Sequence, residues 1–136
     1  MAEEFKFFSP EWCEAAIPVV NSHEATIQGF KDASTFSHRM AFTCAERGLV
    51  THMEWKEGKV AEWSGPQYDE SDLWLIIDAG LATWQAAASG ASEGGKLLLA
   101  GKIKFKKGPM SAAIENAGAF NNFLSSWGMV PTDWDV

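Results

Sequence analysis

Residues 96–127 read KLLLAGKIKFKKGPMSAAIENAGAFNNFLSSW, and the rest of the chain must be arranged around this stretch. Lys102 to Lys106 alternate between lysine and apolar residues, which predicts a strand with one apolar face. Gly108-Pro109 ends the strand, and proline suits the first position of a helix. Apolar residues then follow at helical spacing: Met110, Ala113, Ile114, Ala117, Phe120, Leu124 and Trp127. We expect this helix to cover the apolar face of a sheet, with either solid packing or a ligand between them.

Two segments upstream predict a hairpin whose apolar faces agree. Residues 36–43 and 49–56 both alternate between apolar and polar side chains. If Cys44 pairs with Leu49 across a turn at residues 45–48, the two apolar faces coincide. That agreement between two independent patterns supports the pairing.

A second hairpin turn is predicted at Glu57-Gly58. With Gly58 left-handed in a type I turn followed by a bulge, Ala61 and Trp63 lie on the same face as Met53. A two-residue loop would instead turn a glutamate toward that face, so we prefer the turn with a bulge.

The remaining elements complete an α+β pattern in one domain, residues 1–136. Leu73 to Ile77 are apolar on both faces, which predicts a central strand covered on both sides. A helix is expected from residues 78–81 to Ser89, with Gly90 as its C-terminal stop and a loop after it.

The N-terminal part begins with a helix signal. Ser9 suits the N-cap and Pro10 the first helical position, so a helix is expected up to Asn21. A second helix is expected over about residues 23–30. At the other end of the chain, Trp134 is expected to anchor the tail on the body of the protein.

Composition limits the classes of function. The chain has a formal net charge of -7, which disfavours nucleic acid as a partner. Membrane contact is at most transient, since no apolar run approaches the about 18 residues of a span. Cys13 and Cys44 make neither a metal-ligand spacing nor a disulfide framework. A cytoplasmic setting is the expectation, because no basic-then-apolar leader is present.

Several stretches in this order resemble the sterol carrier protein type 2 family, in its bacterial stand-alone form. Residues 101–110, GKIKFKKGPM, are similar to its glycine-lysine-apolar-lysine-apolar pattern, with one extra lysine before the second glycine. The apolar strand at 73–77 with Asp78, and the helix at 81–89, also match the family's order. The resemblance covers about residues 9–127, and the order of elements carries more of it than any single motif.

The resemblance implies a five-stranded, mostly antiparallel sheet with helices covering one face. Between sheet and helices it implies an apolar tunnel for fatty acids, acyl-CoA esters or sterol-like lipids. It implies no catalytic residues and no cofactor. A lipid tail makes no directional contacts, so apolar area and fit must hold it.

The candidate cavity wall consists of apolar residues on the predicted inner faces. From spacing alone each of them reads more readily as ordinary core, and the resemblance favours a cavity among them. The residues are Met40, Phe42, Met53, Trp55, Trp74, Ile76, Leu81, Trp84, Ile103, Phe105, Met110, Ile114, Phe120, Phe123 and Trp127.

Lys102, Lys104 and Lys106 belong to the one basic cluster of an acidic chain. The preferred interpretation is the solvated side of an edge strand, where lysine discourages aggregation between sheets. The alternative is contact with an anionic head group, a CoA phosphate or a membrane surface.

Three hypotheses about function follow. The first is a carrier that binds a lipid or acyl-CoA ligand and changes no covalent bond. The second is a non-catalytic subunit that docks on a lipid-metabolising enzyme. The third is a small enzyme that acts on hydrophobic CoA esters, for which His38, Cys44 and Asp78 are the available groups, although no spacing aligns them.

Overall fold

A five-stranded sheet forms the base of the molecule in the computed structural model, which describes residues 4–136 apart from the side chain of Ala112. The strand order is β4-β3-β2-β5-β6, and only the central pair, β2 with β5, is parallel. This confirms the predicted five-stranded, mostly antiparallel sheet. The strands are β2 (His38–Cys44), β3 (Leu49–Lys56), β4 (Lys59–Ser64), β5 (Leu75–Ala79) and β6 (Ile103–Lys107).

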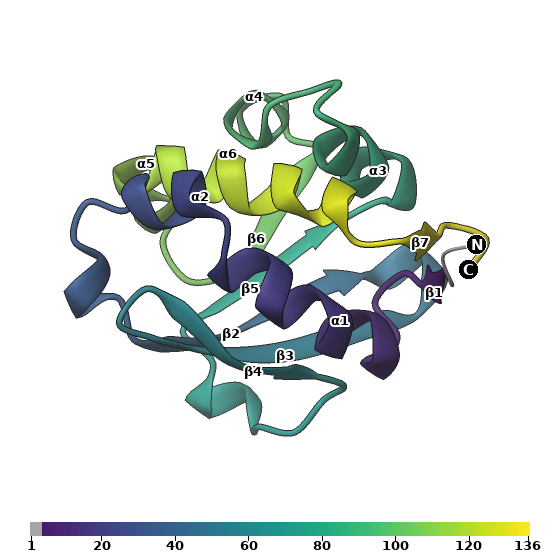
Figure 1. The fold of residues 1–136 in the computed structure, drawn as a ribbon, viewed down its shortest axis with the longest axis horizontal. Helices are drawn as coiled ribbons and strands as arrows, with labels where there is room; N and C mark the ends of the chain where they lie inside the picture. Colours follow the sequence, from purple (N-terminus) through teal and green to yellow (C-terminus); the bar gives the residue numbers. More distant parts are fainter. Residues whose placement is uncertain (1–3) are drawn as a thin grey trace.

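Helices cover one face of this sheet (Figure 1). Helix α1 crosses the face over β4, and α6 runs between α2 on one side and α3 and α4 on the other. The helices are α1 (Pro10–Asn21), α2 (Glu24–Gln28), α3 (Leu81–Ser89), α4 (Gly94–Leu99), α5 (Ser111–Glu115) and α6 (Ala117–Ser126). Short 3-10 turns occur at Ala33–Thr35, Ala45–Arg47, Glu70–Asp72 and Trp127–Met129.

The first hairpin forms as predicted, with Cys44 opposite Leu49. The second differs in its turn. Lys56 pairs with Lys59, so the loop has two residues, and Glu57 and Gly58 both adopt positive φ. The bulge lies inside the hairpin instead, where the register shifts between Glu54 and Trp55.

That bulge corrects which side chains of β4 face the helices. Val60 is opposite Trp55 and Trp63 is opposite Met53, and all four are buried. Ala61, predicted to point inward, is exposed because it is the additional residue of the bulge.

The apolar segment before α3 is covered on one side only. Leu75 and Ile77 face the helices and are buried, whereas Ile76 is half-buried on the opposite face, where it pairs with Lys107. The prediction of a strand covered on both sides was wrong, because the helices lie on only one face of this sheet. Helix α3 does follow, and Gly90 ends it in the left-handed conformation.

The helix predicted from Pro109 to Trp127 is broken. Helix α5 ends at Glu115, Asn116 leaves the helical region, and α6 continues from Ala117. The break changes the phase of the pattern, so Ala119 and Phe123 are buried beside Leu124 and Trp127, which the unbroken pattern also turns inward. Three positions expected to face inward are exposed instead, and these are Met110 (43%), Ile114 (61%) and Ala117.

The N-terminal helix begins and ends where its sequence indicates. The Ser9 hydroxyl accepts a hydrogen bond from the Trp12 backbone N–H at 3.2 Å, and Pro10 is the first helical residue. Asn21 ends α1 and clamps it to β4, since its side chain both donates to and accepts from the Val60 backbone. Helix α2 is shorter than predicted. Its last residue is Gln28, and Gly29 caps it at a position where a Cβ would lie 2.3 Å from the backbone of α6.

The two ends of the described chain lie side by side (Figure 1). Strands β1 (Phe5–Lys6) and β7 (Thr132–Asp133) pair in parallel. The Trp134 ring centroid is 4.4 Å from that of Phe7, so the predicted anchor of the tail is confirmed.

The centre of the core is an aromatic cluster. Trp127 is fully buried, and seven aromatic ring centroids lie 5.3–5.9 Å from its own. They belong to Phe7, Phe8, Trp12, Phe42, Trp63, Trp84 and Phe123. This cluster fills the half of the inner sheet face that lies toward the chain ends.

Candidate functional site

An apolar cavity of about 50 Å³ lies between the sheet and helices α5 and α6. Asn116 is the one polar residue among the fourteen that line it. The lining residues are Phe30, Phe36, Met40, Phe42, Trp55, Trp74, Leu75, Ile77, Phe105, Ala113, Asn116, Ala119, Phe120 and Phe123. Such a wall can hold hydrocarbon and offers almost nothing to a charged group.

The floor of the cavity consists of side chains that alternation along the strands turns toward the helices. Met40 is opposite Leu75 on β2 and β5, and Phe42 is opposite Ile77, which in turn pairs with Phe105 of β6. Because side chains two residues apart share a face, these residues form one continuous apolar surface.

Residues of helix α6 form most of the roof of the cavity. Ala119, Phe120 and Phe123 recur at helical spacing, and Ala113 of α5 extends the roof toward the edge strand. The small side chains of Ala113 and Ala119 leave space that larger residues would fill.

Seven residues proposed from the sequence lie in this wall, and eight lie elsewhere. The lining residues are Met40, Phe42, Trp55, Trp74, Phe105, Phe120 and Phe123. Met53, Trp84, Ile103 and Trp127 are buried in solid core, Leu81 is half-buried against it, Ile76 is on the outer face, and Met110 and Ile114 are exposed.

Seven lining residues were missed. Leu75 and Ile77 were identifiable by alternation, but Ile76, of the opposite parity, was chosen instead. Ala113 belongs to the predicted inner face of the helix but was not included among the candidate wall residues, whereas Asn116 and Ala119 depend on the helix break. The other two are Phe30 and Phe36.

The cavity is too small for a lipid as it stands. A water molecule occupies about 30 Å³ of liquid, whereas ligand pockets are about 300–1,000 Å³. A tail can therefore be accommodated only if part of the wall moves. The five-residue helix α5 is the least embedded part of the roof, since its residues 111, 114 and 115 are exposed.

The mouth of the cavity carries its polar groups. Phe36, Trp74 and Asn116 also border a surface depression, whose other lining residues are Lys31, Asp32, Thr35, His38 and Glu115. The His38 ring stacks on Trp74 with centroids 3.7 Å apart, and burial lowers the pKa of His38. Neutral imidazole is therefore the favoured form at the mouth near neutral pH.

The lysines proposed for head-group contact lie elsewhere. Lys102 lies directly before the edge strand β6, and Lys104 and Lys106 lie within it. All three are exposed and line neither the cavity nor the depression at its mouth. Lys104 pairs with Asp78 across the sheet. This placement agrees with the edge-strand interpretation.

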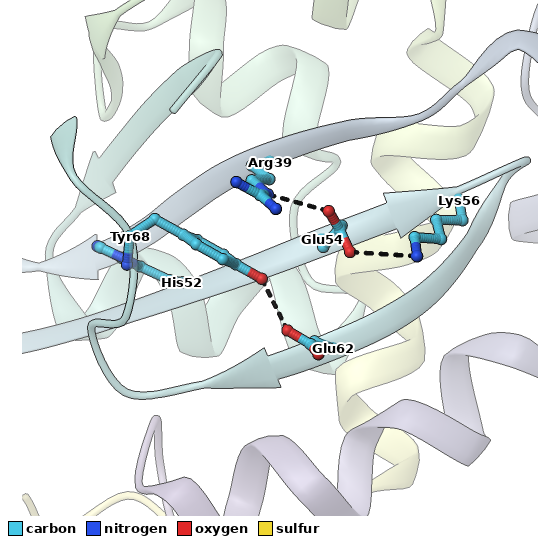
Figure 2. A network of polar contacts seen from close by, with 6 residues as sticks. All are labelled: Arg39, His52, Glu54, Lys56, Glu62 and Tyr68. Atoms are coloured by element: carbon cyan, nitrogen blue, oxygen red, sulfur yellow. Dashed lines mark hydrogen bonds and ion pairs between the residues drawn. The ribbon is translucent and has the colours of Figure 1, made fainter. Parts of the chain in front are cut away.

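A polar network occupies the outer face of the sheet (Figure 2). Arg39 contacts Glu54 at 2.9 Å and lies over the Tyr68 ring, whose hydroxyl donates to Glu62 at 2.8 Å. Burial, followed by the Glu62 contact, raises the pKa of Tyr68 to about 12. The Tyr68 phenol therefore stays protonated near neutral pH, and its contacts with Arg39 and Glu62 hold the loop at 65–72 against the sheet.

His52 fixes that loop and predicts a pH dependence of stability. Its Nδ1 accepts hydrogen bonds from the backbone N–H groups of Gln67 and Tyr68, and burial lowers its pKa below 6.5. The folded state therefore favours neutral His52, and this stabilisation is present above pH 6.5 and is lost as the pH falls through the folded pKa. Urea unfolding of the wild type and of His52→Asn should show a stability difference that shrinks on acidification. Parallel pH curves for the two proteins would contradict this role.

The groups considered for an enzyme do not assemble. His38 and Cys44 occupy opposite ends of β2, about 20 Å apart at the usual rise of a strand. Cys44 is fully buried, and burial raises its pKa. The Asp78 carboxylate accepts from the Thr43 hydroxyl at 2.6 Å and the Ala45 N–H at 2.9 Å.

Neither a family model nor a curated protein matches this chain, but solved structures do. A crystal structure of sterol carrier protein 2 has a TM-score of 0.77 at 23% identity, over 92% of this chain and 99% of its own. The chain has the sterol carrier protein 2 fold. A conserved hypothetical protein from Thermus thermophilus has this fold as well, with a TM-score of 0.72 at 22% identity over 97% of this chain and 94% of its own.

A ubiquinone synthesis protein, UbiJ-SCP2, is more distant, with a TM-score of 0.51 at 10% identity over 90% of both chains. At these identities the similarity establishes the sterol carrier protein 2 fold. The family resemblance inferred from residues 9–127 is thus confirmed at the level of the fold. No helix within residues 4–136 is both long and apolar enough to cross a bilayer.

Proposed function

We propose that residues 1–136 form a single lipid-binding domain. It binds a fatty acid, an acyl-CoA or a sterol-like lipid between the sheet and helices α5 and α6, and carries or presents it with no covalent change. The observation that carries this proposal is the cavity wall, which is apolar at thirteen of its fourteen residues. The fold of sterol carrier protein 2 supports it.

The energetics of an apolar tail suit this site. Burying about twelve methylene groups at about 0.8 kcal/mol each contributes roughly 10 kcal/mol before the costs of ordering the tail and moving the wall. We assign ligand contact to the residues that line the cavity, which include seven proposed from the sequence, and we assign the lysines of β6 to protection of the sheet edge.

Extraction of bound lipid tests the proposal. Protein purified without detergent should release a lipid into organic solvent, and native mass spectrometry should show the corresponding added mass. Titration with a long-chain lipid should also change the tryptophan fluorescence, because Trp55 and Trp74 line the cavity. A protein that carries no lipid and does not respond to fatty acid, acyl-CoA or sterol would refute it.

The lysines of β6 provide a control for that titration. The triple variant Lys102→Gln, Lys104→Gln, Lys106→Gln alters exposed residues outside the cavity and its mouth. Its affinity for lipid should equal that of the wild type. A large loss of lipid affinity would instead support contact between these lysines and an anionic head group.

A second proposal keeps the same cavity and adds a partner. Met110 and Ile114 are exposed at 43% and 61% beside the roof of the cavity. A docking enzyme of lipid metabolism in the cytoplasm, or a transient membrane contact, would cover them. Reciprocal co-purification with and without Ile114→Gln tests the enzyme partner.

A further inference from the structure

Buried tryptophan N–H groups in this core fall into two classes. Trp12 donates to the Thr132 hydroxyl at 2.9 Å, Trp63 to the Thr51 hydroxyl at 3.0 Å, and Trp84 to the Thr43 carbonyl at 2.9 Å. The Nε1 atoms of Trp55 and Trp127 are buried and have no hydrogen-bond partner among the described residues. Such donors are rare, and each costs about 1–3 kcal/mol, so each calls for an explanation.

Trp55 and Trp127 differ in what surrounds them. Trp127 is enclosed by aromatic rings and does not line the cavity. Trp55 is only 3% exposed to solvent, yet it lines the cavity. A molecule in the cavity would therefore contact the Trp55 side chain, which carries a donor without a hydrogen-bond partner among the described residues, in a wall that is otherwise nearly all apolar.

The position of Trp55 orients such a molecule. Its ring centroid is 5.6 Å from those of Phe30 and Phe36, which are half-buried, and 5.1 Å from that of buried Phe123. Trp55 thus lies between the outer and inner parts of the wall. An acceptor that reaches its N–H leaves the hydrocarbon to occupy the space over Phe42 and beneath Phe123.

The charges at the mouth act against an anionic head group. The depression carries one cation, Lys31, and two carboxylates, Asp32 and Glu115. A second depression, which shares Trp55 and Trp74 with the cavity, balances two cations against two carboxylates: Arg39 and Lys56 against Glu54 and Asp72. Asp32 is engaged by Ser34, whose backbone N–H and hydroxyl both donate to it, and His38 favours its neutral form. The chain as a whole carries a net charge of -7, which adds to the repulsion of an anion.

We propose that the ligand is an uncharged lipid whose polar end carries a ketone or ester carbonyl oxygen, and that this oxygen accepts a hydrogen bond from Trp55 Nε1–H. The proposal rests on the function proposed above and narrows its ligand class, away from free fatty acid and acyl-CoA. A hydrocarbon without an acceptor would leave the N–H unpaired, and a carboxylate would meet the negative mouth.

Matched probes test both parts. A long-chain methyl ketone should bind about tenfold more tightly than the n-alkane of equal length, since only the ketone pairs the buried donor. The Trp55→Phe variant should bind the ketone and the alkane with similar affinity. Methyl palmitate should bind more tightly than palmitate to the wild type near neutral pH, and added salt should narrow that difference.

NMR of the wild type provides a readout that does not depend on the ligand affinity of the variant. The Trp55 indole N–H resonance, assigned by its absence from the Trp55→Phe spectrum, should move downfield with the ketone and much less with the alkane. The Trp127 resonance should move much less with both probes, because Trp127 does not line the cavity.

Two results would overturn the inference and leave the proposed function standing. One is a ketone that binds without moving the Trp55 resonance, which would mean that the N–H pairs with water or stays unpaired. The other is palmitate binding more tightly than its methyl ester. If none of the probes binds and no lipid is extracted, the proposed function fails, and this inference fails with it.

Discussion

Trp127→Ala should lower the free energy of unfolding by about 3 kcal/mol, a large share of the 5–15 kcal/mol typical of a domain. Truncation of a buried tryptophan costs about 3–5 kcal/mol, through lost contacts and the void left behind. Trp127 is fully buried, but its N–H is unpaired, so removing that donor offsets part of the cost and favours the lower end. Urea unfolding followed by circular dichroism measures the change.

Met129→Ala is the matched control. Met129 lies two residues further along the chain and is 62% exposed, so its truncation should change stability by no more than about 0.5 kcal/mol. If Trp127→Ala cost as little as this control, the aromatic cluster would not be the solid half of the core.

Local signals in the sequence were sufficient for most of the sheet and for several helix ends. Cys44 faces Leu49 because two alternating patterns have only one register in which both bury their apolar faces. Ser9 begins α1 by accepting a hydrogen bond, and Gly90 ends α3 in the left-handed conformation; both residue types favour these positions. Such features depend on a few neighbouring residues, and the order of elements then indicated the fold.

Features that depend on tertiary packing could not be predicted in this way. The bulge at Ala61 restores the register after a two-residue turn, and either turn was compatible with the sequence. The only glycine near the helix break at Asn116 is Gly118, inside the first turn of α6, and the apolar spacing runs through the break. Helix α4 was missed altogether, because Gly94-Gly95 reads as a loop.

The candidate site was predictable only in part for the same reason. Alternation identifies which side chains of β2 and β6 face the helices, such as Met40, Phe42 and Phe105. It does not show which part of that face is hollow. Trp84 and Trp127 fill one half, and small residues of α5 and α6 leave the other half open. A hollow is a property of the facing layer, so a pattern within one element cannot locate it.

Ala113→Phe should therefore reduce lipid affinity at least tenfold without a comparable loss of stability. Ala113 is 8% exposed and lines the cavity, so a phenyl ring there occupies space that a tail would need. Overpacking a core site costs about 1–3 kcal/mol, but an added ring can enter the cavity, which lowers that cost. Fluorescence titration with a long-chain lipid measures affinity, and urea unfolding measures stability.

Ile114→Phe is the control, and it also decides between two interpretations of the roof. Ile114 is the next residue of α5 and is 61% exposed, so the same ring placed there should leave affinity unchanged. An unbroken helix from Pro109 to Trp127 would instead turn Ile114 inward. If Ile114→Phe weakened lipid binding as much as Ala113→Phe does, the ligand-bound protein would contain the unbroken helix, with Ile114 facing the cavity. Equal affinity of Ile114→Phe and wild type, with loss confined to Ala113→Phe, would show that the break at Asn116 sets the shape of the cavity when a lipid is bound.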